Sequence, residues 1–366
     1  MKIETIDIRV CKGGQGDAVA ASKLPGGARP AFIVVTIGTD EGLTGTSFGF
    51  ATLDPYAAAH AMAPVKQFFL GRDPVERERA WQDFRRYNRN WTHVPIYAYG
   101  PFDNACWDIV GQMARLPLHR LLGGARDRLP TYVSSMFLAD ASAYVEQALE
   151  VKAAGFRGYK VHPPGVLDVD LDVYRAVREA VGPDFTLMSD PVGAYNYGQA
   201  LRAGRVLEEL DYRWLEEPVY DHDWKTQAKL ARDLDIPIVG TETLPGAHQS
   251  TAQYIAGNVV DIVRTDVSWR GGVSGVIKVA SLADAFGMQC ELHTCVYHAL
   301  DLINLHCAVA VSNCEFFELL YPFTDFDFGL KTGITLEDGY AVPPSGPGLG
   351  IDYDWNFIDD QTVAVL

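Results

Sequence analysis

The decisive stretch of this sequence comprises FTLMSDP at residues 185–191, RWLEEP at residues 213–218 and PIVGTETL at residues 237–244. Each apolar run ends in an acidic residue, and 26 positions separate neighbouring members of the set Asp190, Glu216 and Glu242 (190 to 216, 216 to 242). That interval holds one β-strand and one helix with their turns. We therefore expect adjacent parallel strands whose carboxyl ends bring the three carboxylates to one edge.

The same alternation extends on both sides of this stretch. Five further β-rich runs are separated by helical stretches: TYVSSMF (131–137), GYKVHP (158–163), DIVRTDV (261–267), MQCELHT (288–294) and CEFFELL (314–320). Eight parallel strands with helices between them favour a closed α/β barrel over residues 126–324. The chemistry of such a barrel is expected at the carboxyl ends of its strands.

The first 125 residues follow a different pattern. Residues 1–10 and 28–50 alternate like β-strands, whereas residues 55–123 show helical periodicity. We expect an α+β domain over residues 1–125. The tail at about residues 325–366 is rich in Gly, Pro and aromatic residues, leaves the strand–helix rhythm and is expected to pack back on this domain.

Charge and composition exclude several classes of partner. The chain has 47 acidic and 31 basic residues, a formal net charge of −16. Such a surface repels phosphate backbones and anionic lipids, so neither nucleic acid nor membrane is expected as a partner. No apolar run reaches the roughly 20 residues of a membrane span. The six cysteines form no Cys-x-x-Cys pair, so we expect reduced thiols in a cytoplasmic protein.

The three carboxylates at strand ends form a candidate metal site. Asp190, Glu216 and Glu242 would repel one another unless a cation lay between them, and ligation by oxygen alone with open positions suits Mg²⁺. The alternative is that each acid caps the following helix, which explains one such acid better than three in register. Glu217 is expected to point to the opposite face of its strand and to make structural contacts.

Two residue pairs flanking these carboxylates are candidate acid–base groups. Lys160 and His162 lie two apart on the second strand and therefore share one face. Asp266 and His293 end successive strands, 27 positions apart (266 to 293), and a hydrogen bond between them would fix the imidazole tautomer and raise its basicity. The alternatives are an exposed lysine and core histidines. Because the second and seventh strands lie far apart round the barrel, the two pairs are expected to face each other across a substrate.

Other residues are candidates for substrate binding. Glu318 on the eighth strand would add a hydrogen bond to a bound carboxylate, and Glu315 competes with it for that role. Trp269 and Arg270 follow Asp266 and are expected to reach the site. The loops at about 13–28 and 47–56 are expected to line the outer pocket, where they offer Lys23, Arg29, Ser47, Phe48 and Phe50 to substrate or solvent.

Taken together, these motifs resemble the enolase superfamily in its mandelate racemase-like subgroup, the mandelate racemase/muconate lactonizing enzyme family. The resemblance covers nearly the whole chain, and NACWDIVGQMARLPLHRLLGG (104–124) is similar to the family's junction between cap and barrel. Asp190, Glu216 in WLEEP and Glu242 in GTETL resemble the family's metal triad. Asp266 in RTDVSWRGG and His293 in ELHTC resemble its His–Asp dyad.

The resemblance implies an α/β fold with a modified (β/α)₇β TIM-type barrel and an α+β N-terminal capping domain. It also implies a small carboxylate substrate bound to Mg²⁺, removal of the α-proton through an enediolate and, by analogy, a homo-oligomer. An α-proton beside a carboxylate is weakly acidic, and its removal builds a second negative charge. Mg²⁺ and cationic donors stabilise that charge where it develops.

One position departs from the family's pattern, which often has Lys-x-Lys on the second strand. The first lysine matches Lys160, which implies contact with the substrate carboxylate. His162 stands in place of the second lysine and would take its acid–base role. Lys160 and Mg²⁺ disfavour an imidazolium nearby, so we expect His162 to be neutral at pH 7. A neutral imidazole can act as a base without the lowered pKa that a lysine needs.

Two bases on opposite sides of a substrate permit more than one reaction. If one removes the α-proton and the other protonates a leaving 3-hydroxyl, an acid sugar or hydroxy acid is dehydrated to a 2-keto-3-deoxy acid. We favour this outcome because dehydration is widespread in the subgroup, with His293 as the main catalyst and His162 as its partner or a substrate contact. The alternatives are racemisation, epimerisation or cycloisomerisation of a 2-hydroxy acid, and an inactive member that serves as a binding protein.

Overall fold

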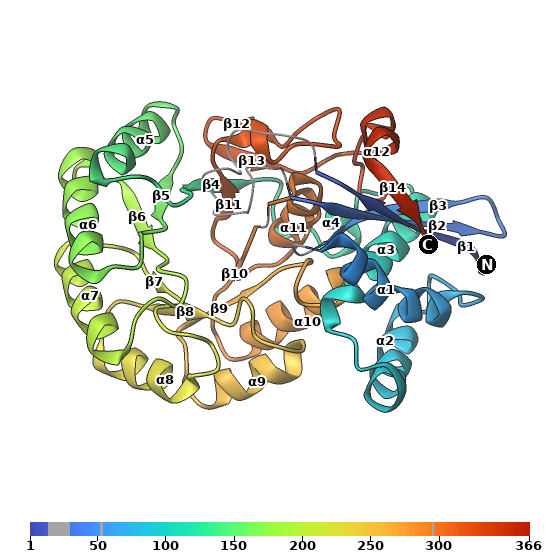
Figure 1. Ribbon diagram of the computed structural model, residues 1–366, viewed down its shortest axis with the longest axis horizontal. Coiled ribbons are helices and arrows are strands. Elements are labelled where there is room, and N and C mark those ends of the chain that lie inside the picture. Colours follow the sequence, from blue (N-terminus) through green and yellow to red (C-terminus); the bar gives the residue numbers. More distant parts are fainter. Residues whose placement is uncertain (14–29, 52–53, 295) are drawn as a thin grey trace.

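The molecule combines an antiparallel capping sheet with a parallel α/β barrel, as the sequence predicted (Figure 1). A computed structural model describes residues 1–13, 30–51, 54–294 and 296–366. In the view of Figure 1 the barrel helices form an arc on one side, and the cap with both chain termini lies on the other. In these described ranges, no helix is long and apolar enough to cross a membrane.

The capping sheet has the strand order β14-β1-β2-β3, with every pair antiparallel. Its strands are β1 (Ile3–Cys11), β2 (Phe32–Thr39), β3 (Thr44–Phe50) and β14 (Thr362–Val365). The helices of this part are α1 (Pro55–Phe69), α2 (Arg77–Tyr87), α3 (Gly100–Ala114) and α4 (Leu118–Leu121), with a π-helical turn η2 (Asn88–Thr92) and a 3₁₀ turn η3 (Ile96–Ala98).

Alternation along β2 gives the capping sheet two buried faces. Ile33 and Val35 join the apolar cluster that contains residues of α1 and α3, whereas Phe32 and Val34 join the main cluster that contains the barrel. Successive side chains of a strand point to opposite faces, so an apolar run without polar breaks is needed when both faces are covered. The sheet is therefore a layer between its own helices and the rest of the protein.

In the described ranges, eight parallel strands form the barrel, and seven of them are followed by a helix. The strands are β4 (Leu129–Ser134), β5 (Gly158–Val161), β6 (Thr186–Ser189), β7 (Leu215–Glu216), β8 (Ile238–Gly240), β9 (Ile262–Thr265), β10 (Cys290–Leu292) and β11 (Phe317–Leu320). The helices between them are α5 (Ala141–Ala153), α6 (Leu167–Val181), α7 (Tyr197–Glu209), α8 (Trp224–Asp233), α9 (His248–Ala256), α10 (Gly272–Ala285) and α11 (His298–Ala310). Pairing runs in sequence order from β4 to β10, and β11 returns to pair with β4.

Helix α3 of the cap supplies the N-terminal caps of barrel helix α10. Asp103 accepts hydrogen bonds from the backbone N–H of Ser274 at 2.8 Å and from its hydroxyl at 2.7 Å. Asn104 accepts from the backbone N–H of Val273 at 3.0 Å. Gly272 has φ +77°, and a Cβ there would lie 2.8 Å from the carbonyl oxygen of Gly100. This contact places the loop between β9 and α10 against the cap, where that loop contributes to the site.

The tail after β11 contacts both parts of the molecule. Its elements are η4 (Phe323–Asp325), β12 (Thr335–Glu337), β13 (Tyr340–Val342) and α12 (Trp355–Gln361), followed by β14. Strand β13 pairs with β4 of the barrel, and β14 completes the capping sheet by pairing with β1. The division of the chain at residue 125 stays a prediction.

Candidate active site

Three carboxylates converge at the mouth of the barrel. Asp190 follows β6, Glu216 ends β7 and Glu242 follows β8, and one oxygen of each lies within 4.8 Å of the others. Adjacent parallel strands deliver side chains to the same edge of a barrel, which explains the convergence. The all-oxygen donor set fits a divalent cation such as Mg²⁺, which these three residues would hold.

Backbone strain accompanies each of these three residues. Val192, Glu217 and Thr241 are non-glycine residues with positive φ, at +52°, +37° and +79°. A non-glycine residue in this region costs about 1–3 kcal/mol and persists only where its surroundings hold it. The Thr241 hydroxyl, for example, donates to the carbonyl oxygen of Arg264 at 2.9 Å. Strain so close to three converging carboxylates is typical of a functional site.

The turn at Glu217 corrects one prediction. Its positive φ bends the chain directly after Glu216, so the Glu217 side chain lines the pocket and does not point to the opposite face of the strand. Its carboxylate accepts a hydrogen bond from the backbone N–H of Glu242 at 3.0 Å. Burial raises the pKa of Glu217 to about 8, and the charges of Asp190 and Glu216 add to the effect.

Two buried cations lie beside the carboxylates. Lys160 on β5 lies 3.0 Å from Glu216 and 2.8 Å from Glu318, and Arg264 on β9 lies 2.8 Å from Glu216 and 2.6 Å from Glu318. Burial opposes the charge of Glu318, but Lys160 and Arg264 outweigh it and hold the pKa of this carboxyl well below its usual range. Lys160 is 1% exposed and is not part of the pocket lining, so its predicted contact with a substrate stays a prediction.

His293 and Asp266 form the hydrogen-bonded pair that their spacing indicated. The Nδ1 atom of His293 lies 3.0 Å from Asp266, and Nε2 lies 3.3 Å from Glu242. The Asp266 carboxylate can accept a hydrogen bond from the Nδ1–H of His293, which fixes the orientation of the ring. Burial opposes the imidazolium, but Glu242 and Asp266 outweigh it and raise the pKa of His293 to about 9.

His162, directly after β5, borders the same pocket. Its Nδ1 lies 2.6 Å from the carbonyl oxygen of Ser135, which can only accept, so Nδ1 carries a proton. Its Nε2 lies 3.1 Å from Asp190. Burial works against the charge of Asp190, but Lys160 and His162 outweigh it and lower the pKa of the Asp190 carboxyl to about 2. The neutral state expected for His162 stays a prediction.

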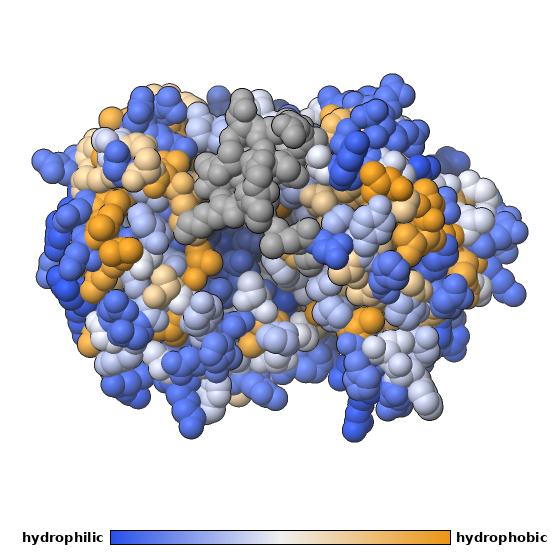
Figure 2. All heavy atoms as spheres, viewed as in Figure 1, coloured by the Kyte–Doolittle hydropathy of each residue, from blue (hydrophilic) through white to orange (hydrophobic). Residues whose placement is uncertain are grey.

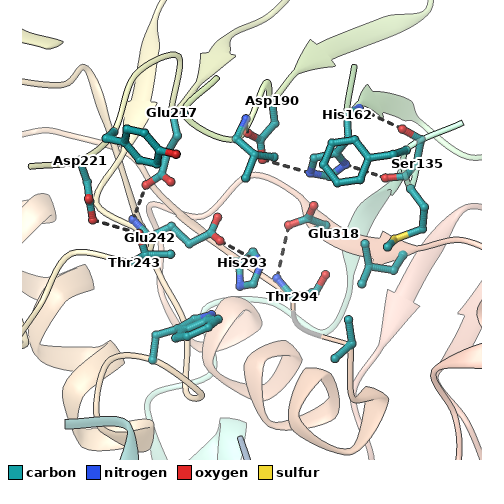
Figure 3. A pocket seen from close by; sticks show the side chains of 18 of the residues that line it. Ser135, His162, Asp190, Glu217, Asp221, Glu242, Thr243, His293, Thr294 and Glu318 are labelled. Carbon is teal, nitrogen blue, oxygen red and sulfur yellow. Dashed lines mark hydrogen bonds and ion pairs between the residues drawn. The ribbon is translucent and has the colours of Figure 1, made fainter. Parts of the chain in front are cut away.

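A cavity of about 440 Å³ lies between the barrel mouth and the cap, and its lining includes His162, Asp190, Glu242, His293 and Glu318. Figure 2 shows a hollow in the centre of this face of the molecule, and Figure 3 shows His162, Asp190, Glu242, His293 and Glu318 pointing into the pocket. Trp269 and Phe50 also line it, with ring centroids 4.2 Å apart. The backbone N–H of Trp269 donates to Asp266 at 2.6 Å, which ties this wall to the dyad.

Several residues expected near the substrate lie elsewhere. Phe48 is fully buried and stacks on Phe32 and Tyr353, because it points from the capping sheet toward the main core. Ser47 is also buried, and its hydroxyl accepts a hydrogen bond from the Asn104 amide. Lys23 and Arg29 lie outside the described residues.

Arg270 and Glu315 are likewise turned away from the pocket. The Arg270 guanidinium is buried and donates to three carbonyl oxygens and to the Thr251 hydroxyl, so it braces the loops after β8 and β9. Glu315 pairs with Arg213 and Gln289 before β11 begins. Glu318 therefore lines the pocket and Glu315 does not.

Sequence reasoning missed Arg264 and the loop residues Ser135, Met136, Phe137, Val192, Tyr220 and Asp221, all of which border or underlie the pocket. The sequence did carry a signal for Arg264: it is the charged residue of the strand segment IVRT (262–265) and lies two positions before Asp266, so period two places both side chains on the same face. The loop residues had none, because only the folded loops bring them to the pocket.

The sequence matches two family descriptions that together span most of the chain. Residues 143–357 match "Enolase C-terminal domain-like", and residues 26–123 match "Mandelate racemase / muconate lactonizing enzyme, N-terminal domain". This chain belongs to the mandelate racemase/muconate lactonizing enzyme family of the enolase superfamily. The predicted family is thereby confirmed.

Relatives in this family include dehydratases and cycloisomerases of sugar acids. The chain is 30% identical to arabinonate dehydratase of Saccharolobus solfataricus, covering 93% of this chain and 94% of that one. It is 28% identical to D-galactarolactone cycloisomerase of Agrobacterium fabrum, covering 88% and 89%. The crystal structure of D-glucarate dehydratase from Agrobacterium tumefaciens complexed with magnesium is 32% identical, covers 100% of both chains and has a TM-score of 0.88.

Proposed function

We propose that this protein is a Mg²⁺-dependent dehydratase that converts an acid sugar or hydroxy acid to a 2-keto-3-deoxy acid. The observation that carries the proposal is that the hydrogen-bonded pair His293–Asp266 and the three converging carboxylates Asp190, Glu216 and Glu242 meet at one cavity, which His293, Asp190 and Glu242 line. Relatives of about the same length that act on sugar acids support the substrate class.

Asp190, Glu216 and Glu242 would hold the ion, which when bound supplies positive charge for the substrate carboxylate. Lys160 and Arg264 add cationic charge beneath the same carboxylates. The acidity of the α-proton rises when such charge offsets the electrons released by its removal.

His293 is proposed as the base, in its neutral form. A cation held by Glu242 would favour that form, because it would offset the negative charge that raises the pKa of His293. Its Nε2 takes the proton from the carbon next to the carboxylate, and the electron pair of that C–H bond moves toward the carboxylate to give an enediolate. Asp266 holds Nδ1 and stabilises the imidazolium that results. The C3–O bond then breaks as the enediolate electrons return, and the 3-hydroxyl leaves as water after accepting a proton from one of the two histidines.

His162 is proposed as the acid partner or as a contact to the substrate. It directly follows β5, as His293 directly follows β10, and both side chains point into the cavity (Figure 3). The resulting enol becomes the 2-keto-3-deoxy acid when C3 takes up a proton. A cycloisomerase is the second candidate, favoured by the relative that acts on D-galactarolactone.

The test is proton NMR in D₂O with Mg²⁺ and a panel of aldonic and aldaric acids. Loss of the α-signal with gain of C3 methylene signals is expected for wild type, and His293→Asn should lower turnover by about 10³-fold or more. Near-normal turnover by this variant would refute the role of His293. Deuterium exchange at the α-carbon without loss of hydroxyl groups would indicate racemisation or epimerisation and not dehydration.

Calorimetry tests the alternative that this protein is an inactive family member that serves as a binding protein. Wild type should bind Mg²⁺, and Glu242→Gln should bind it much more weakly because one of three charged ligands is lost. A wild-type protein that binds no Mg²⁺ would support a binding protein over an enzyme.

A further inference from the structure

The hydrogen-bond ladder between β9 and β10 ends at the pair His293–Asp266. Leu292 lies opposite Thr265 in these parallel strands, and the backbone N–H of His293 donates to the carbonyl oxygen of Thr265 at 3.0 Å. In a parallel ladder, a residue bonds through its N–H and its C=O to the residues on either side of the one opposite. The next bond of this ladder would therefore run from the backbone N–H of Val267 to the carbonyl oxygen of His293.

The side chain of Asn304 takes the place of that bond. Its Oδ1 accepts from the backbone N–H of Val267 at 2.9 Å, and its Nδ2 donates to the carbonyl oxygen of His293 at 3.0 Å. The amide cannot be reversed, because a backbone N–H only donates and a carbonyl oxygen only accepts. Asn304 lies on α11 and is fully buried, so both hydrogen bonds are shielded from water. One side-chain amide is thus inserted between the ends of the two strands.

This inserted amide contacts the backbone of both halves of the pair. Val267 directly follows Asp266, and the other partner is the carbonyl group of His293 itself. Asp266 Oδ1 accepts from the backbone N–H of Trp269 at 2.6 Å, and Oδ2 lies 3.0 Å from Nδ1 of His293. The Asp266 carboxylate is therefore fixed by its own loop. The distance from Oδ2 to Nδ1 then depends on how far apart the two strand ends are held.

We propose that Asn304 is a positioning residue, whose amide holds the ends of β9 and β10 at the separation that lets His293 and Asp266 form their hydrogen bond. Asn304 acts through the backbone of the pair and not through contact with a substrate. This inference rests on the proposed function, because it takes the pair to be the group that removes the α-proton. A displacement of about 1 Å at a reacting group can lower a rate by about 10²-fold, so this spacing controls turnover.

Replacing Asn304 by leucine tests this role. Asn304→Leu keeps a side chain of similar size and removes both hydrogen bonds, and Asn304→Ala removes the same bonds without added bulk, should leucine prevent folding. The readout is proton NMR of the His293 Nδ1–H in protein that carries isotope-labelled histidine and is saturated with Mg²⁺. The signal is assigned by its absence in His293→Asn. A proton donated to a carboxylate resonates far downfield, and its position reports the hydrogen bond without any substrate.

Both Asn304 variants should move the His293 Nδ1–H signal upfield or abolish it, because the strand ends lose the amide that joins them. For an acid that wild type dehydrates, kcat should fall about 10- to 100-fold while KM stays within about threefold.

Asn313→Leu is the matched control. The Asn313 side-chain amide donates to the carbonyl oxygens of Ala280 and Met288 at 3.1 Å each, and Asn313 precedes β11, at the end of the barrel opposite the site. This variant also loses two hydrogen bonds made by one amide and should lose stability. It should leave the His293 Nδ1–H signal and kcat unchanged.

The outcomes separate this inference from the proposed function. A signal at the wild-type position in a folded Asn304 variant overturns the positioning role, and dehydration by wild type would leave the proposed function standing. Equal changes in Asn313→Leu, or a shifted signal with unchanged kcat, also overturn it. A shifted signal in a protein whose wild type turns over no acid supports the positioning of the pair and counts against dehydration.

Discussion

Replacing Arg264 by methionine tests whether the buried cations hold the site together. Arg264 is fully buried and contacts Glu216 at 2.8 Å and Glu318 at 2.6 Å, and it donates to the carbonyl oxygen of Leu292 at 3.1 Å. Removing one partner of a buried ion pair costs about 3–5 kcal/mol, because the other charge is left uncompensated. Lys160 still lies beside both carboxylates, so the lower end of that range, about 3 kcal/mol, is expected.

Urea and thermal unfolding measure this loss. About 3 kcal/mol corresponds to a fall in Tm of roughly 4 °C for a chain of 366 residues. Arg264→Lys should recover only part of this stability. The planar guanidinium of arginine reaches two carboxylates and a carbonyl oxygen at once, whereas the compact ammonium of lysine does not. The matched control is Arg202→Met, which breaks an exposed pair with Asp168 at 2.9 Å and should cost less than about 1 kcal/mol.

Calorimetry with Mg²⁺ gives an independent readout. Arg264→Met removes one positive charge next to Glu216, so Mg²⁺ should bind more tightly than in wild type. A stability loss no larger than that of Arg202→Met would refute the idea that Arg264 compensates buried charge. A weaker affinity for Mg²⁺ would show that Arg264 acts mainly by orienting Glu216.

Two further changes address strain and pH. Val192→Asn should raise the free energy of unfolding by about 1 kcal/mol, because Val192 has φ +52° and asparagine tolerates this conformation better. Val192 is 49% exposed, so little packing is lost. A Tm below that of wild type would contradict the strain argument. Burial raises the pKa of Glu291 to about 7 from an unfolded value near 4.5, so wild type loses stability as pH rises between these values. Glutamine does not titrate, so the free energy of unfolding of Glu291→Gln should rise relative to that of wild type by up to about 3 kcal/mol between pH 4.5 and pH 8. Urea unfolding measures both proteins across this range, and a difference between them that does not change with pH would refute the prediction.

The order of strands and helices could be predicted from the sequence because it depends on the local periodicity of apolar residues. Short apolar runs and the helical stretches between them recur along the barrel region, and the eight expected runs correspond to β4 through β11. Parallel strands place their carboxyl ends at one edge. The spacing of Asp190, Glu216 and Glu242, and of Asp266 and His293, therefore predicted which side chains would meet.

The tertiary structure decided where the side chains just beyond the strand ends point. Strict alternation places Glu217 on the face opposite Glu216, but the strand ends at Glu216 and a left-handed turn brings Glu217 into the pocket. The orientation of a loop side chain depends on contacts with elements distant in sequence. The side chain of Arg270 is a second example. It donates hydrogen bonds to carbonyl oxygens of the loop after β8, and these contacts hold it away from the cavity.

By itself, the sequence determined the barrel, the capping sheet and the residues that converge at the strand ends, because these follow from local periodicity and one repeated interval. Only the tertiary structure decided how charge is balanced inside the barrel. Arg264 and Lys160 acquire their partners Glu216 and Glu318 from strands up to 158 residues away (160 to 318), and burial makes those pairings energetically important. The chemistry of the cavity walls was likewise set by packing between the cap and the barrel, as Phe50 against Trp269 shows.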